Sequence, residues 1–350
     1  MMRSFRFLFF ATLSYAPLFA AATNLPDISV LGDLTAQTST DEAFEDRNRV
    51  TLRGIELALQ GYLYPEMRAD VFLAMHRHEG ALEPEVCEAS VSFLRLFFDG
   101  LGMQAGKIHV DFGKLNKIHQ HERPFVDQPL VLTNFFGPHG LVGEGAVVNY
   151  LFPLPFFLRL DGGVWCIPAH EHSHEEAVIE EPLEFGMAGK VHTARLWSGF
   201  GLGDRTELEI GASGAQGNGA HYIEHQDEVM VGGADLTFRF LPKSHCRIIS
   251  QSEVFYLNRT VPMGTLERFG AYSHLGVQFN KYWDAGMRFD YSENAMPDES
   301  TAMLISAIGC HRFTETTRLR VQYGFDPDAS SHCGAVQLVF GIGPHTHPLQ

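Results

Sequence analysis

Residues 318–325 decide the fold, and they run Arg-Leu-Arg-Val-Gln-Tyr-Gly-Phe. Arg318, Arg320 and Gln322 are polar, and the residues between them are apolar or aromatic. Side chains alternate between the two faces of a β-strand, so this pattern predicts a strand with one polar and one apolar face. The same alternation recurs through the chain, for example over residues 107–112, 283–291 and 336–342.

A soluble β-sandwich and a membrane β-barrel can both produce this alternation, but they turn the apolar face in opposite directions. Two features favour the barrel. The alternating segments extend over about 10 to 13 residues, which suits a tilted strand that crosses a bilayer. Aromatic residues such as Tyr62, Trp165, Trp197 and Trp283 lie near segment ends, where a membrane barrel carries its interfacial girdle.

The connections between segments indicate the number of strands. We predict about sixteen strands between residues 28 and 343, within a range of about 14 to 18. Short turns alternate with longer loops, and the longer ones cover residues 40–49, 79–84, 114–142, 166–182, 218–228, 260–267, 293–300 and 327–332. Short periplasmic turns and longer external loops are typical of outer-membrane barrels. The predicted fold class is therefore all-β: a transmembrane antiparallel β-barrel of porin-like size.

The N-terminus predicts export from the cytoplasm. Arg3 and Arg6 precede an apolar run, and Ala20 to Ala22 supply the small residues of a cleavage site. Residues 1–22 therefore form a predicted signal peptide, and residues 23–350 form the barrel. We expect the protein to lie in the cell outer membrane, with outer-membrane lipid and the barrel-assembly machinery as partners.

The third long connection, residues 114–142, is the longest. Its second half is apolar and contains proline, as in Phe125, Pro129 and Phe136. Long loops are usually functional, and an apolar loop packs against another surface. We expect this loop to fold into the lumen and to narrow it.

One group of sequence motifs resembles a known family. The motifs are 105–107 with 112–116, which run Ala-Gly-Lys and Phe-Gly-Lys-Leu-Asn, the pair His119 and His121, and 124–130, Pro-Phe-Val-Asp-x-Pro-Leu. Residues 25–30 and 340–345 fit the same pattern. Together they resemble the Gram-negative outer-membrane proteins labelled zinc-regulated outer-membrane receptors, which are similar to phosphate-selective porin-like barrels of sixteen strands. The resemblance covers both ends of the chain and the third loop, and its motifs are short.

The receptor label implies TonB-dependent transport, which this chain does not fit. Such receptors have about 22 strands and a plugged lumen. The first predicted strand here follows the signal peptide almost directly. We therefore favour the porin-like interpretation over the receptor.

Eighteen histidines form several alternating groups. Residues two apart in an extended chain share a face, so both imidazoles can reach one ion. The candidate metal ligands are His170, His172 and His174, the pair His119 and His121, and the pair His76 and His78, all expected on the external rim. Nitrogen ligands beside carboxylates suit Zn²⁺, Ni²⁺ or Cu²⁺. The alternative remains that these histidines are ordinary polar loop residues or hydrogen-bonded residues of the lumen.

Alternation also identifies charged residues on the lumen face. The candidate pore-lining residues are Lys107, His109, Asp111, Arg159, Arg288, Arg318 and Arg320. Mixed charges create a transverse field that influences which ions pass. The competing interpretation is that these charges only pair with one another to fill the barrel.

Composition and motifs narrow the function. The formal net charge of −16 argues against nucleic acid as a partner. The sequence contains no recognisable catalytic motif, so we do not expect an enzyme. We expect no required cofactor, and weak binding of Zn²⁺. We predict a porin-like channel for passive passage of small solutes or ions, linked to acquisition of divalent metal such as zinc and able to form a homotrimer. The alternative is a barrel-anchored surface protein that binds metal or adheres, without an open pore.

Overall fold

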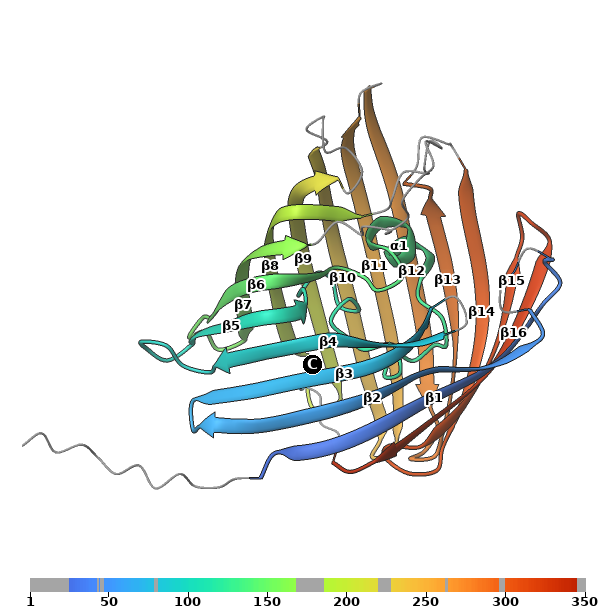
Figure 1. Cartoon of the computed structure of the whole chain (residues 1–350). Coiled ribbons are helices and arrows are strands. Elements are labelled where there is room, and N and C mark those ends of the chain that lie inside the picture. Colours follow the sequence, from blue (N-terminus) through green and yellow to red (C-terminus); the bar gives the residue numbers. More distant parts are fainter. Residues whose placement is uncertain are drawn as a thin grey trace, which may run out of the picture.

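The computed structural model is a closed antiparallel barrel, which confirms the predicted fold class (Figure 1). It describes residues 25–42, 44, 47–78, 81–167, 186–219, 228–261, 264–295 and 300–344. The strands are β1 (Asp27–Ser39), β2 (Arg49–Tyr64), β3 (Met67–His78), β4 (Ala81–Phe93), β5 (Leu101–His109), β6 (Val142–Leu151), β7 (Phe157–Ile167), β8 (Met187–Gly201), β9 (Thr206–Gly219), β10 (Glu228–Lys243), β11 (Cys246–Val261), β12 (Gly264–Gln278), β13 (Trp283–Glu293), β14 (Thr301–Arg312), β15 (Arg318–Asp326) and β16 (Ser331–Ile342).

Each strand pairs with its neighbours in the sequence, and β1 closes the barrel by pairing with β16. This last ladder runs antiparallel from Val30 opposite Ile342 to Ser39 opposite Cys333. Closure leaves no strand at an open edge, so the backbone N–H and C=O groups of the wall can pair within the sheet. Sixteen strands in one closed sheet match the predicted count.

The two faces of the wall differ as the alternation predicts. On β13, the side chains of Arg288 and Asp290 are buried, with 1% and 0% of their surface exposed, whereas Met287 and Phe289 are 61% and 45% exposed. On β15, Arg320 is likewise buried and its neighbours face outward. The polar residues therefore face the interior, and the apolar ones form an outer belt of the kind that contacts lipid.

The connections are less regular than predicted. The predicted loop 79–84 is much shorter, because β3 extends to His78 and β4 begins at Ala81. The predicted loop 260–267 is shorter in the same way, between Val261 and Gly264. Polar residues and a proline at these strand ends resembled loops in the sequence, yet the ladder continues through them, as in the pairing of Met75 with Pro84. Strand ends that extend beyond the apolar belt are in contact with water and need no apolar face.

Strand β5 is shorter than predicted, and this changes the role of residues 107–112. It ends at His109 instead of continuing to residue 113. The alternation over residues 107–112 predicts that Ile108, Val110 and Phe112 form the apolar outer face of a strand, but they are buried in the interior at 3% exposure or less. Ile108 faces the interior from β5 itself, where it pairs with Gly143 on the face that also carries the buried Val147. The chain leaves the wall after His109, so Val110 and Phe112 also pack inside the barrel instead of facing lipid.

The described residues contain one short helix, α1 (Leu130–Phe136). No helix in the described ranges is long and apolar enough to cross a membrane. The predicted signal peptide, residues 1–22, lies outside the residues that the structure describes, as do His170, His172 and His174.

Candidate functional site

The candidate site is built by residues 110–141, named here the inner loop, which connect β5 to β6. Figure 1 shows this segment and its helix α1 within the barrel, enclosed by the wall strands. Helix α1 packs against β12, β13 and β14. The inner loop starts four residues before the predicted boundary of 114, because the chain turns inward directly after His109.

Aromatic side chains hold the inner loop against the wall. Phe112, Phe125 and Phe136 are buried at 0%, 1% and 6% exposure. The ring of Phe112 lies 5.7 Å from that of Phe255 on β11, and the ring of Phe125 lies 6.2 Å from that of Tyr272 on β12. Aromatic pairs at these distances stabilise beyond the area they bury. The apolar half of the loop thus has the packing surface that its composition required.

The buried side-chain amide of Asn116 joins the first and last residues of the inner loop. Asn116 Nδ2 donates hydrogen bonds to the carbonyl oxygens of Val110 (2.8 Å) and Leu141 (2.9 Å), and the Leu141 N–H donates to Asn116 Oδ1 (2.8 Å). Gly140 adopts a φ of 74°, and a Cβ at this position would lie 2.4 Å from Asn116 Oδ1. Asn116 and Gly140 therefore hold together the two ends of a long loop.

Arginines of the wall anchor the far side of the inner loop through its backbone. Arg53 Nη1 on β2 donates to the Val126 carbonyl at 2.8 Å. Arg320 Nη2 donates to the His121 carbonyl at 2.9 Å, and Arg318 donates to the same carbonyl.

The side chain of Asp127 receives further bonds from the same part of the wall. Arg288 Nη1 lies 3.0 Å from Asp127 Oδ1 and donates to the Asp127 carbonyl at 3.2 Å. Gln322 Nε2 donates to Asp127 Oδ1 at 2.6 Å, and the Val126 N–H donates to Gln322 Oε1 at 2.9 Å. Arg288, Arg318 and Arg320, which the sequence proposed as pore-lining residues, thus contact the inner loop from the lumen face.

The opposite side of the barrel binds the start of the inner loop. Asp111 Oδ1 lies 3.3 Å from Arg195 Nε on β8, and the Gly113 N–H donates to Ser213 Oγ on β9 at 3.0 Å. The Lys114 N–H donates to a carboxylate oxygen of Glu253 on β11 at 2.9 Å. Burial raises the pKa of Asp111, but the charges of Lys117 and Arg195 lower it by more, so the pKa lies below its usual value. Asp111 is therefore an anionic anchor.

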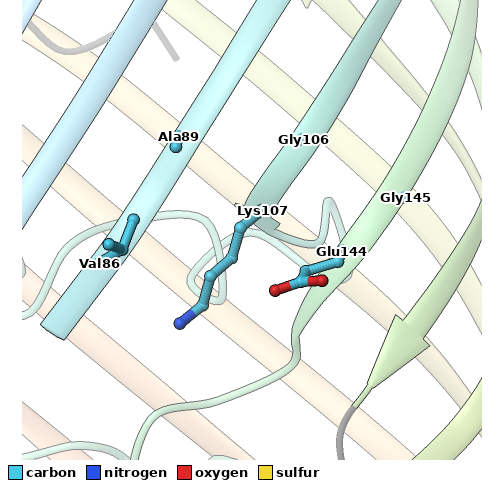
Figure 2. A pocket seen from close by; sticks show the side chains of 6 residues that line it. All are labelled: Val86, Ala89, Gly106, Lys107, Glu144 and Gly145. Carbon is cyan, nitrogen blue, oxygen red and sulfur yellow. The ribbon is translucent and has the colours of Figure 1, made fainter.

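The remaining predicted pore-lining residues have wall partners. Arg159 pairs with Asp161, whose Oδ1 accepts at 2.6 Å. Lys107 was expected on the lumen face, but it pairs with Glu144 on the face of β6 that also carries the exposed Val148, so this prediction was wrong. Its Nζ lies 3.2 Å from Glu85 Oε1. Figure 2 shows Lys107 and Glu144, which are cross-strand partners, in a pocket of the wall. The ladder between β4 and β5 ends where Ala89 pairs with Lys107, whereas β4 continues to pair with β3 beyond this point. The pocket lies at the end of the β4–β5 ladder.

Three histidines and two glutamates meet where the inner loop passes β2, β4 and β5. His119 Nδ1 lies 3.0 Å from Glu56 Oε2, and His121 Nδ1 lies 4.0 Å from the same oxygen. On its other edge, His119 Nε2 lies 3.5 Å from Glu88 Oε1, and His109 Nδ1 lies 2.7 Å from that oxygen. We name these five residues the histidine cluster. His119 and His121 were expected on the external rim, but both are buried inside the barrel, at 7% and 9% exposure.

The histidine cluster has unusual electrostatics. Burial lowers the pKa of His119, but the hydrogen bonds to Glu56 and Glu88 raise it by more, to about 10. Next to the cluster in the inner loop, burial raises the pKa of Glu122 to about 7, against the opposing charges of Arg318 and His119. Two groups of the cluster have the composition of a three-ligand metal site: Glu56, His119 and His121, and Glu88, His109 and His119. In each group, one potential ligand atom per residue lies within 4.8 Å of the others.

The other predicted metal ligands cannot be placed in a site. His170, His172 and His174 lie outside the described residues, so their metal binding stays a prediction. His76 and His78 belong to the last residues of β3, and the structure describes their backbone pairing only. Glu56 and Glu88 were not predicted as members of a site. Each lies on an alternating strand, but no local pattern connects either of them with His119.

Comparison with known proteins supports the fold. No family model matches the chain. An uncharacterized protein of Aquifex aeolicus is 27% identical over 287 residues, which cover 71% of this chain but only 60% of that protein.

Solved structures of outer-membrane barrels match almost the whole chain at low identity. An OmpF of Salmonella typhi has a TM-score of 0.59 at 10% identity, covering 91% of this chain and 97% of that one. The anion-selective porin of Comamonas acidovorans has a TM-score of 0.58 at 12% identity, covering 91% and 100%. The trimer form of OmpT from Vibrio cholerae has a TM-score of 0.53 at 9% identity, again covering 91% and 100%. The fold is thus that of a porin-like outer-membrane barrel, and with its apolar belt it indicates a protein of the outer membrane.

Proposed function

We propose that this protein is a porin-like channel through which small solutes or ions pass passively along a narrow path beside the inner loop. One observation carries the proposal: the inner loop crosses the interior of a closed barrel and is anchored on opposite sides of it. Arg195 on β8 holds its start, and Arg320 on β15 holds its middle. A loop placed in this way reduces the free cross-section.

The charged lining favours small hydrated solutes over apolar ones. Buried arginines and carboxylates face the interior on β8, β10, β13 and β15, as in the pair of Arg195 on β8 and Asp235 on β10 at 2.7 Å. Because charges of both signs are present and largely paired, the lining forms neither a purely cationic nor a purely anionic filter. We therefore expect modest selectivity and low conductance.

Single-channel recording in planar bilayers tests this proposal. We expect small, discrete conductance steps from the refolded protein, and larger steps from a variant in which a short Gly-Ser linker replaces residues 117–139. If the intact protein is silent and only the trimmed variant conducts, the inner loop is a plug and the proposal is wrong. If neither conducts although both fold, the barrel is not a channel.

A second candidate function is a barrel-anchored surface protein that binds metal or adheres, without an open pore. The number of anchors favours it, because the inner loop is bonded to β2, β8, β9, β11, β13 and β15. A link to zinc acquisition is supported only by the family resemblance and by the histidines. Recording with and without Zn²⁺ tests that link, since a zinc-conducting channel would carry a Zn²⁺ current.

We also propose that the protein forms a homotrimer. The support is the fold shared with a solved barrel whose structure is described as a trimer form. Native mass spectrometry of the protein in detergent should give three chains per particle. A particle of one chain at all protein concentrations would refute the trimer.

A further inference from the structure

The histidine cluster has the geometry of a metal site that joins the inner loop to the wall. We propose that Glu56, His119 and His121 bind one divalent transition-metal cation, such as Zn²⁺, and that Glu88 orients His119 from the opposite edge of its ring. The site is independent of whether the barrel conducts. Two ligands come from the inner loop and one from β2.

Distances support the assignment of the three ligands. Zinc binds histidine nitrogen and carboxylate oxygen at about 2.0–2.2 Å, so two ligands of a tetrahedral ion lie about 3.4 Å apart. Glu56 Oε2 lies 3.0 Å from His119 Nδ1 and 4.0 Å from His121 Nδ1. Shifts of less than about 1 Å would bring these atoms to ligand spacing.

The second edge of His119 has the partner that a metal-bound histidine requires. A ligating imidazole usually donates its other N–H to a carboxylate, which fixes the ring and its tautomer. With Nδ1 on the metal, Nε2–H points at Glu88 Oε1, which lies 3.5 Å away. Glu88 is in turn held by His109 Nδ1 and the His109 N–H, at 2.7 and 3.0 Å.

Charge and ligand type favour a transition metal. A bound cation would replace the proton that His119 holds between Glu56 and Glu88. With the three histidines neutral, the cluster then carries the two negative charges of Glu56 and Glu88, which one divalent cation would balance. Imidazole ligands favour Zn²⁺, Ni²⁺ or Cu²⁺ over Ca²⁺ and Mg²⁺, which prefer oxygen. The ring of Phe72 lies 4.9 Å from that of His119 and covers one side of the site.

The test measures Zn²⁺ stoichiometry and affinity of the refolded barrel in detergent, by competition with a chromophoric chelator. All variants are made in a background that lacks His170, His172 and His174, because that run can bind Zn²⁺ by itself. We expect one Zn²⁺ per barrel in this background. Co²⁺ in its place should give the absorption bands of a tetrahedral site.

The variants separate ligands from supporting residues. Glu56→Gln and His121→Asn should abolish the site, and Glu88→Gln should weaken Zn²⁺ binding by about 10- to 100-fold. His274→Asn is the matched control, since His274 is also buried and its ring lies 5.4 Å from that of Phe125 in the inner loop. The His274→Asn variant should bind Zn²⁺ with the same stoichiometry and affinity as the background protein. Circular dichroism and heat-modified gel migration check that each variant is folded.

Two results would overturn the proposal. The first is a background protein that binds no Zn²⁺, or binds it equally well after Glu56→Gln, which is nearly isosteric and should not unfold the loop. The second is loss of the ion in Glu88→Gln with no effect of His121→Asn, which would show that Glu88, His109 and His119 are the ligands. Because binding is measured without a bilayer, a silent channel would leave the metal assignment intact.

Discussion

Asn116 makes three of the hydrogen bonds that join the two ends of the inner loop, so its substitution should weaken the packing of this loop inside the barrel. Asn116→Ala removes three hydrogen bonds and leaves a buried N–H of Leu141 without its side-chain acceptor. Each such bond contributes about 1 kcal/mol net, so the docked loop should lose about 2–4 kcal/mol. Limited proteolysis in detergent should then cut faster between residues 114 and 138.

A turn asparagine provides the control for this prediction. Asn280 Oδ1 accepts hydrogen bonds from the N–H groups of Tyr282 (2.8 Å) and Trp283 (3.0 Å), in the turn between β12 and β13. Asn280→Ala should leave cleavage of the inner loop unchanged. Equal cleavage of the Asn116→Ala variant and the unmodified protein would show that aromatic packing alone holds the loop.

At the scale of elements, α1 approaches the wall closely because β12 carries a glycine there. A Cβ on Gly270 would lie 2.4 Å from Val131 Cγ2 of α1, and Val131 is fully buried. Gly270→Ala should therefore displace α1 and destabilise the docked loop by about 1–3 kcal/mol, the usual cost of overpacking. Hydrogen exchange of the α1 amides should accelerate.

The matched control is Gly309→Ala on β14, because a Cβ there meets nothing within 4 Å. Its α1 exchange rates should equal those of the unmodified protein. The double variant Gly270→Ala with Val131→Ala should recover part of the protection, since the clash involves the Val131 side chain. Unchanged exchange in Gly270→Ala would mean that the wall adapts and that α1 is not held by this contact.

At the same scale, the sequence predicts the faces of individual strands but not the contacts between distant elements. Alternation is local, so β13 and β15 could be predicted with the correct faces from a few residues each. The inward turn after His109 could not, because Ile108, Val110 and Phe112 alternate in the same way whether they face lipid or pack inside. The histidine cluster was only half predictable: His119 and His121 form a visible motif, but Glu56 precedes His119 by 63 residues. Only the closed barrel brings them together.

At the scale of the whole molecule, the outer belt predicts how the barrel sits in a membrane. Met287 is central on β13, pairs with Ala307, and is 61% exposed on the outer face. An arginine on the lipid face near the midplane of a bilayer costs about 2–4 kcal/mol, and one near the interface costs about 0–1 kcal/mol. Met287→Arg should therefore lower the free energy of unfolding in liposomes far more than Thr301→Arg, since Thr301 begins β14 opposite Glu293 at the end of the ladder.

Comparing two environments makes this last prediction specific to the membrane. In liposomes the hydrocarbon surrounds the belt, so the charge at residue 287 must be desolvated or must deform the bilayer. In a detergent micelle that remains intact in urea, the detergent rearranges around the charge. The difference in the free energy of unfolding between Met287→Arg and Thr301→Arg should therefore be smaller in micelles than in liposomes. Equal free energies of unfolding for the two variants in liposomes would show that residue 287 does not face hydrocarbon. The barrel would then be displaced along the bilayer normal, and the assignment of the outer belt would have to be revised.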